Sequence, residues 1–311
     1  MKHTWRITVI LAVFFLLAQI IGLLIISQYI DHNASSEAKE TVMKPLPYGF
    51  ERPQIENKSA SFIYIVVAII FGTLLVLLLA RFNKPLIWKI WFFLTIWFTL
   101  SVALAAFINN IAAAILALAL AILKFYKPNV IVQNLSEIFV YGGLAAFFVN
   151  IFNLFAIVML LIVISIYDYI SVFKTMHMVK LAEFQYNSKV FAGLFIPYER
   201  TSSKEKIIFN ADLKKDFKKM SKAKSDYSEK SVAVLGGGDI GFTLLFAGVV
   251  MKDLMLVNDV WIGFLKTLII PVFATIALLF LLVKGRQNKF YPAMPILSLG
   301  CFIGYSIVWL I

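Results

Sequence analysis

The chain contains nine long apolar runs, spread over almost all of its 311 residues. A helix needs about 20 predominantly apolar residues to cross the hydrocarbon core of a bilayer. The composition agrees with this reading, because 61% of the residues are hydrophobic and only 15% are charged. We therefore predict an all-α polytopic membrane protein. Its nine transmembrane helices are expected at residues 7–30, 60–80, 86–107, 108–123, 129–150, 154–173, 232–251, 261–283 and 291–311.

Two of these boundaries depend on short polar interruptions. The third and fourth spans are separated by Asn109 and Asn110, and the fifth and sixth by residues 150–153. If either pair were fused, the resulting helix of about 40 residues would be roughly 60 Å long, twice the thickness of the hydrocarbon core. We therefore predict a break in the helix at both positions.

The spans divide the chain into three parts. Residues 1–173 carry the first six helices, residues 174–231 form a basic loop, and residues 232–311 carry the last three helices. Apolar and polar residues are interleaved over 176–185, which is typical of a short helix lying in the membrane interface. Residues 190–198 form a second apolar patch, which is too short to cross a bilayer.

The basic residues beside the spans predict the orientation. Lys2 and Arg6 before the first span, Lys124 and Lys127 after the fourth, and the lysines of the loop all fall on one side of the membrane. Because cytoplasmic segments carry an excess of Lys and Arg, we expect a cytoplasmic N-terminus and an extracytoplasmic C-terminus. The net charge of +12 is attributed to these residues and to contact with anionic lipid headgroups, so no nucleic-acid partner is predicted.

Two aspartates lie inside apolar runs. A carboxylate at membrane depth costs roughly 2.5 kcal/mol or more, so each one marks a candidate functional site. Asp168 lies about 7–8 Å from the loop-facing end of the sixth span, and Asp239 lies about 10 Å into the seventh. If these two spans are antiparallel neighbours, the two carboxylates lie at matching depth.

Two close carboxylates can hydrolyse a peptide bond. They cannot easily both ionise, so the pair shares a proton. The charged member can take a proton from water while the neutral member donates to the carbonyl oxygen of the peptide bond that is cleaved. This chemistry needs no metal and no cofactor. The chain has three histidines, His3, His32 and His177, and no His-Glu-x-x-His motif for zinc.

The segment before Asp239 consists of Gly236, Gly237 and Gly238. Because glycine has no Cβ, Gly236 and Gly238 let the helix start irregularly and let another backbone approach closely. The preceding residues 231–235 are β-prone and suited to pairing with an unwound substrate by strand addition, which makes Leu235 a candidate substrate contact.

A proline motif, Pro292-Ala293-Met294-Pro295, opens the ninth span. Two prolines three residues apart remove two hydrogen-bond donors, so we expect an irregular helix start there. The motif lies at the same end of the predicted bundle as Asp168 and Asp239.

These motifs resemble those of the presenilin and signal peptide peptidase family of intramembrane aspartyl proteases. That family carries Tyr-Asp in the sixth helix, Gly-x-Gly-Asp in the seventh and Pro-Ala-Leu-Pro at the ninth. Here the corresponding segments are Tyr167-Asp168, residues 236–239 and residues 292–295, with Met294 in place of Leu, a volume-conserving change. The resemblance covers most of the chain. It implies that Asp168 and Asp239 are catalytic, that Tyr167 belongs to the site, and that the proline motif shapes the site and receives substrate.

The resemblance also implies partners. The charge pattern favours the orientation of presenilins, for which substrates would be single-span proteins with a cytoplasmic C-terminus. The chain has a modest basic loop where eukaryotic presenilins carry a large insertion, and its N-terminal tail is short. It is therefore most similar to a compact microbial homologue, for which we expect activity without partner subunits.

Two alternatives stay open at this point. A cation leak channel or proton-coupled transporter could use the buried carboxylates as relays; inverted repeats would favour it, and the sequence shows none. A peptidase of the prepilin or preflagellin type also uses a Gly-x-Gly-Asp aspartate, although we know of no Pro-Ala-x-Pro element in those enzymes and their span counts are usually lower. Substitution of the aspartates separates the classes, because Asp→Asn abolishes cleavage by a protease and alters flux through a channel.

Overall fold

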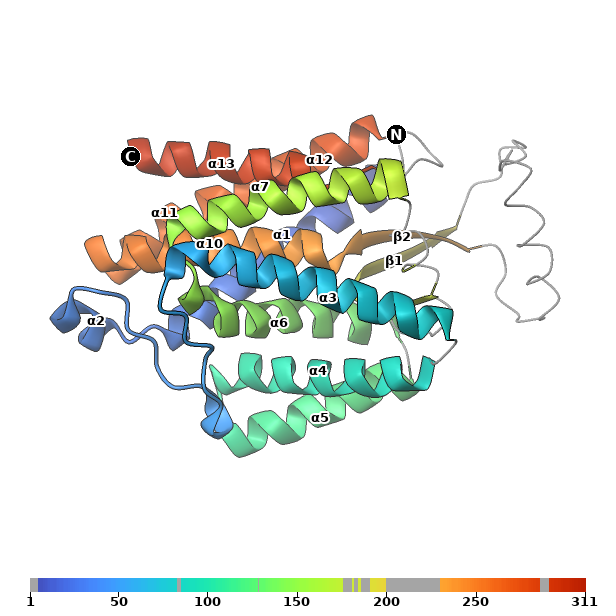
Figure 1. The fold of residues 1–311 in the computed structure, drawn as a ribbon, viewed down its shortest axis with the longest axis horizontal. Helices are drawn as coiled ribbons and strands as arrows, with labels where there is room; N and C mark the ends of the chain where they lie inside the picture. The colour runs from blue at the N-terminus through green and yellow to red at the C-terminus, as the bar shows by residue number, and fades with distance from the viewer. Residues whose placement is uncertain are drawn as a thin grey trace.

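The computed structural model describes residues 5–82, 85–127, 129–175, 181, 184–185, 191–199, 230–285 and 291–311. These residues form a bundle of helices with a two-stranded hairpin at one end (Figure 1). The elements are α1 (Trp5–Tyr29), α2 (His32–Ala38), η1 (Pro47–Gly49), η2 (Lys58–Ala60), α3 (Ser61–Arg81), α4 (Pro85–Ala105), α5 (Asn110–Tyr126), α6 (Val130–Phe148), η3 (Val149–Ile151), α7 (Leu154–Ile170), η4 (Ser171–Thr175), β1 (Gly193–Glu199), β2 (Lys230–Gly236), α10 (Gly237–Val257), α11 (Val260–Thr267), α12 (Ile269–Lys284) and α13 (Met294–Leu310).

Seven helical segments of the described chain are long and apolar enough to cross a membrane. They are Trp5–Tyr29, Lys58–Arg81, Leu86–Ala105, Val130–Ile151, Leu154–Lys174, Gly237–Val257 and Val260–Lys284. Two further apolar helices, α5 and α13, have 17 residues each and run alongside the longer ones (Figure 1). The predicted mainly helical fold with several apolar spans is therefore confirmed, and the count of nine crossings stays a prediction.

Both predicted breaks between closely spaced spans are confirmed, and asparagine side chains explain them. The side chain of Asn109 accepts a hydrogen bond from the amide of Ala112 at the start of α5. Asn153 does the same for the amide of Ala156 at the start of α7. A side-chain acceptor at this position satisfies an otherwise unpaired amide, so each asparagine favours a new helix over continuation of the old one.

The segment before α10 differs from the prediction. The seventh helix was expected from residue 232, but it begins at Gly237, because Lys230–Gly236 form β2 and pair antiparallel with β1. The apolar patch at 190–198 supplies most of β1. Buried residues of both strands, such as Leu194 and Ala233, join the core and stabilise the hairpin against the helices. The interfacial helix expected at 176–185 falls largely outside the described residues.

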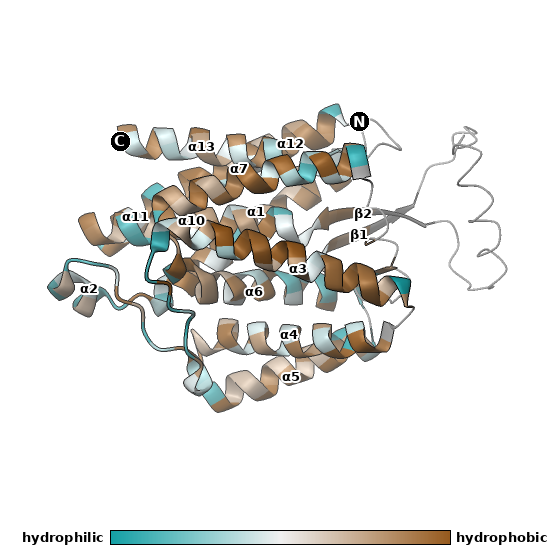
Figure 2. Cartoon of the chain, in the orientation of Figure 1, coloured by the Kyte–Doolittle hydropathy of each residue, from teal (hydrophilic) through white to brown (hydrophobic). Residues whose placement is uncertain are grey.

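The helix α10 lies in the interior of the bundle. Two thirds of its most apolar window (67%) is buried, whereas none of the corresponding window of α3 is. The helices α1, α6, α7 and α13 all contact α10. Figure 2 shows that α3, on the outside, is hydrophobic along most of its length, as expected for a helix that faces lipid. The body of α10 is therefore enclosed by other helices, whereas its first residues, Gly237 to Asp239, stay partly exposed.

We call the end of the bundle that carries β1 and β2 the hairpin end. The helices α1, α10 and α13 begin there, and α3, α5, α7 and α12 end there (Figure 1). Asp168, close to the last residue of α7, and Asp239, close to the first residue of α10, both lie at this end.

Candidate functional site

The two aspartates lie on neighbouring antiparallel helices. Asp168 is two residues before the end of α7, Asp239 is two residues after the start of α10, and the two helices contact each other. Asp168 is buried, with 5% of its surface exposed, and Asp239 is partly exposed. The two carboxylates therefore come from the same end of two packed helices and differ in their access to the surroundings.

The start of α13 contacts the carboxylate of Asp168. The amide of Met294 donates to Asp168 Oδ2 at 3.1 Å, and the amide of Ala293 also interacts with this carboxylate. These two amides belong to the first turn of a helix, where backbone donors have no partner within the helix. Pro295, which follows them, has no amide hydrogen, and proline suits the first turn of a helix. The proline motif thus directs two backbone donors at one carboxyl group.

Side chains near Asp168 join α7 to its neighbours. Ser165, one helical turn before Asp168, shares a hydrogen bond of 2.9 Å with Ser298 of α13. The hydroxyl of Tyr167 donates to Thr73 Oγ1 of α3 at 3.4 Å. Tyr167 therefore ties α7 to α3, whereas Ser165 and Asp168 face α13.

The three glycines before Asp239 lie in different surroundings. A Cβ on Gly237 would lie 2.4 Å from the hydroxyl oxygen of Tyr141, which is far too close for two atoms that are not bonded. A Cβ on Gly236 would lie 3.2 Å from Asp239 Oδ2, and a Cβ on Gly238 would meet only Phe242, at an ordinary 3.6 Å. Of the three, Gly237 is the position at which the absence of a side chain allows the closest packing.

A buried polar network on α6 lies behind Gly237. The hydroxyl of Tyr141 donates to Glu137, and Glu137 forms an ion pair with Lys124 of α5. The side chains of Lys124 and Glu137 are only 4% and 1% exposed. The side-chain amide of Gln133 also donates to Glu137 Oε1, at 3.2 Å. This network was not among the site residues predicted from the sequence; its signal there is Glu137, a lone carboxylate within a predicted span.

The helix α6 also covers one edge of the hairpin. The side chain of Asn134 donates to the carbonyl of Phe195 at 2.9 Å and accepts from its amide at 2.8 Å. Gln133 donates to the carbonyl of Gly193 on the same edge of β1. In the described part of the chain, the sheet has two strands, so the far edge of β2 is not paired with another strand.

The strand β2 presents alternate side chains to opposite sides. Leu235 is 5% exposed and packs in the hydrophobic core, whereas Val234 is 43% exposed. The side chain of Leu235 therefore faces the protein interior, and its backbone carbonyl lies against Gly193 of β1.

Gln19 of α1 is a further polar residue near Asp239 that was not predicted from the sequence. Its side chain is fully buried and donates to the carbonyl of Ile240 at 3.0 Å and to Thr243 Oγ1 at 2.9 Å. Ile240 directly follows Asp239 in the chain. The signal in the sequence is an uncharged polar residue in the middle of an apolar run.

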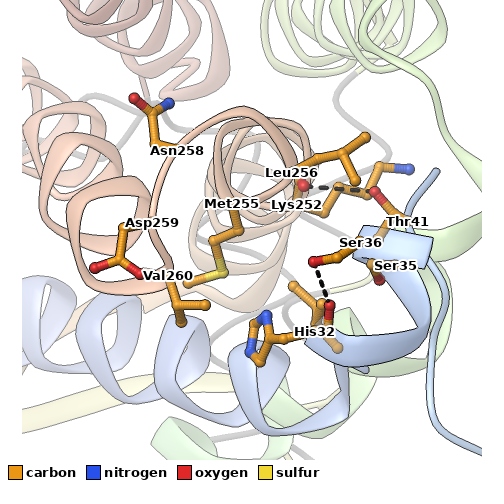
Figure 3. A pocket seen from close by; sticks show the side chains of 11 residues that line it. His32, Ser35, Ser36, Thr41, Lys252, Met255, Leu256, Asn258, Asp259 and Val260 are labelled. Carbon is orange, nitrogen blue, oxygen red and sulfur yellow. Dashed lines mark hydrogen bonds between the residues drawn. The ribbon is translucent and has the colours of Figure 1, made fainter. Parts of the chain in front are cut away.

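A small cavity of about 180 Å³ lies at the opposite end of the bundle, near His32 and Met255 (Figure 3). Met255 is about 24 Å along α10 from Asp239, at 1.5 Å per residue, so the cavity is separate from the two aspartates. The hydroxyl groups around it donate to backbone carbonyls: Thr41 donates to the carbonyl of Lys252, and Ser36 donates to that of His32.

Among the described residues, no group of three or more His, Cys, Asp and Glu side chains could bind a metal ion.

Comparison with known proteins adds a family and a fold. The family described as signal-peptide peptidase, presenilin aspartyl protease matches residues 12–311. The structure of a presenilin family intramembrane aspartate protease in space group C222 has a TM-score of 0.56 and 17% identity, over 98% of each chain. The structure of such a protease in space group P2 gives 0.56 and 16%, over 96% of each chain. At these identities the likeness shows the fold. A comparison with curated proteins found no match.

Proposed function

Because the chain belongs to the signal-peptide peptidase and presenilin family of aspartyl proteases, we propose that it cleaves peptide bonds within transmembrane segments, with Asp168 and Asp239 as its catalytic pair. One observation carries this proposal. The two carboxylates come from the same end of two packed antiparallel helices, and the proline motif of α13 contacts one of them. All three motifs named from the sequence therefore belong to one end of the bundle.

The chemistry follows from two carboxyl groups in a site of low dielectric constant. The pair shares a proton, so one member takes a proton from water while the other donates to the carbonyl oxygen of the substrate. The amides of Met294 and Ala293 fix the orientation of the Asp168 carboxyl group. Asp239, the more exposed of the two, is the member that approaching substrate meets first.

We propose that substrate adds to the sheet at the far edge of β2. The backbone groups of Phe195 point to Asn134, so Val234, its partner across the ladder, points its own backbone groups to the far side. Gly236 lies two residues further along the same edge. An extended substrate paired there runs beside the chain that leads directly to Asp239.

The protein is an integral membrane protein, and we propose that its hairpin end faces the cytoplasm. The helices α3, α5 and α12 carry Arg81, Lys124 and Lys284 in their last turns, and all three helices end there (Figure 1). Substrates would then be single-span proteins with a cytoplasmic C-terminus. We also propose that the chain acts without partner subunits.

The test is cleavage of a single-span reporter by the purified chain in lipid vesicles, with products identified by mass spectrometry. We expect the parent protein to cleave, and Asp168→Asn and Asp239→Asn each to lower the rate by about 10² to 10⁴, the usual contribution of one acid–base group. Asp253→Asn is the matched control, because Asp253 is an exposed carboxylate near the other end of α10, and it should keep the parent rate.

Cleavage that survives either Asp168→Asn or Asp239→Asn would overturn the proposed pair. A pure chain that becomes active only when other membrane proteins are added would overturn the proposal that it needs no partner. A chain that cleaves nothing but passes cations, with flux altered in both Asp→Asn variants, would favour a channel.

A further inference from the structure

Gln19 is a buried polar side chain in the middle of the apolar helix α1. Its whole surface is buried, and a buried amide is costly unless it forms hydrogen bonds. Both bonds that Gln19 donates go to α10, at 3.0 Å to the Ile240 carbonyl and at 2.9 Å to Thr243 Oγ1. A leucine would fill the same space without this requirement, so the polar group at this position calls for a functional reason.

The two acceptors belong to the helical turn that contains Asp239. Thr243 Oγ1 lies 2.8 Å from the carbonyl of Asp239, to which it donates, and 3.0 Å from that of Ile240. Gln19 therefore binds the carbonyl of Ile240, the residue after Asp239, directly, and it reaches the carbonyl of Asp239 through the hydroxyl group of Thr243. Both connections join α1 to α10 across more than 200 residues of sequence.

The first turn of α10 needs support from outside the helix. It begins with Gly237 and Gly238, and Gly236 before them provides no side-chain cap. Glycine in a helix costs about 1 kcal/mol relative to alanine, so this turn has little stability of its own. Tyr141 packs against it from α6, and Gln19 binds it from α1.

The spacing between α1 and α10 is fixed close to Gln19. One turn further along α1, a Cβ on Gly22 would lie 2.3 Å from the side chain of Leu244, so the two helices are in close contact there. This contact sets the distance between the helices. The hydrogen bonds of Gln19 additionally fix how α10 is rotated about its axis, and its position along that axis, beside Asp239.

We propose that Gln19 is a positioning residue that orients Asp239 through the backbone of α10. The inference rests on the proposed function, in which Asp239 is catalytic. A displacement of about 1 Å in a catalytic group can cost on the order of 100-fold in rate, so loss of these two hydrogen bonds should lower kcat. Substrate binds elsewhere, at the strand edge, so KM should change little.

The experiment compares Gln19→Leu with the parent protein in the vesicle cleavage assay. We expect kcat to fall about tenfold or more, with KM within about twofold and a shifted pH–rate profile, because the environment of Asp239 changes. Thr8→Val is the matched control. Thr8 is also fully buried on α1, but its hydroxyl has no hydrogen-bond partner in the described structure, so this variant should keep kcat.

A second pair of variants covers the case in which Gln19→Leu does not fold. Thr243→Val should lower kcat, and Thr243→Ser, which keeps the hydroxyl, should recover most of that loss. The double variant Gln19→Leu/Thr243→Val should be about as slow as the slower single variant, since the two residues act through one connection.

The outcomes separate this inference from the proposed function. If the parent is no faster than Asp239→Asn, the proposed function fails. If the parent is active, Asp239→Asn is inactive and Gln19→Leu keeps the parent kcat, only the positioning role fails. The positioning role also fails if Gln19→Leu loses kcat only in proportion to its unfolded fraction and Thr243→Ser is as slow as Thr243→Val.

Discussion

The backbone amide of Met294 donates to the Oδ2 atom of Asp168 at 3.1 Å, across 126 residues of sequence. This contact joins the start of the last apolar helix to the end of α7. It gives the proline motif a role beyond interrupting a helix, because the motif presents backbone donors to a buried carboxyl group. Asp168 thus has a structural role that can be separated from its proposed chemical one.

That separation predicts different stabilities for two Asp168 variants. Asp168→Asn keeps an oxygen that can accept from Met294, so its thermal midpoint should stay near that of the parent protein. Asp168→Leu leaves a buried amide without an acceptor, which costs about 1–3 kcal/mol. Thermal unfolding in detergent, followed by circular dichroism, measures both. Equal midpoints for the two variants would contradict a role for this hydrogen bond in stability.

Because Gly237 packs against Tyr141, we expect a substitution of Tyr141 to offset part of the damage caused by a substitution of Gly237. Gly237→Ala should lower both stability and cleavage, because its methyl group would overlap the Tyr141 hydroxyl. Tyr141→Phe removes that oxygen, so the double variant should lose less than the sum of the single variants. Gly238→Ala is the control, since its Cβ meets only Phe242 at an ordinary distance. Additive losses in the double variant would show that the two residues do not interact.

The buried ion pair between Lys124 and Glu137 predicts an asymmetric response. Glu137→Gln leaves a buried ammonium group without its counter-charge, and breaking a buried pair in this way costs about 3–5 kcal/mol. Lys124→Met/Glu137→Gln removes both charges and should be more stable than Glu137→Gln alone. The measurement is the thermal unfolding midpoint in detergent of the parent protein, the single variant and the double variant. A double variant less stable than Glu137→Gln would show that the charges contribute independently.

His32, outside the membrane-spanning helices, predicts a dependence of stability on pH. Burial lowers the pKa of His32 below its usual 6.5, and nearby Lys44 lowers it further, against the opposing effect of Asp31. The unfolded chain therefore binds a proton more readily than the folded chain. This contribution to stability is complete above the unfolded pKa and is lost as the pH falls through 6.5 towards the folded pKa.

The measurement compares the thermal midpoints of the parent protein and His32→Gln at about pH 7.5 and about pH 5.5, on either side of the usual histidine pKa. The parent should lose more stability on acidification than the variant, which has no imidazole to protonate. An equal loss in both proteins would assign the pH dependence to other groups.

The sequence by itself determined the class of the protein and the places where its helices break. Hydropathy depends on each residue and its neighbours in the chain, so the apolar runs were visible without a structure. The breaks before α5 and α7 were visible for the same reason, because Asn109 and Asn153 cap the helices that directly follow them. The three motifs were readable because each is a short contiguous segment.

Only the tertiary structure decided which polar groups meet. The strand pairing of residues 193–199 with 230–236 replaced a predicted helix start, because a strand is stabilised by a partner distant in the sequence. The contacts of Gln19 with Ile240, and of Met294 with Asp168, depend on how each helix is rotated about its axis and on which neighbour it packs against. Local preferences fix neither quantity, since a helix that is apolar on all sides can turn any face towards its partner.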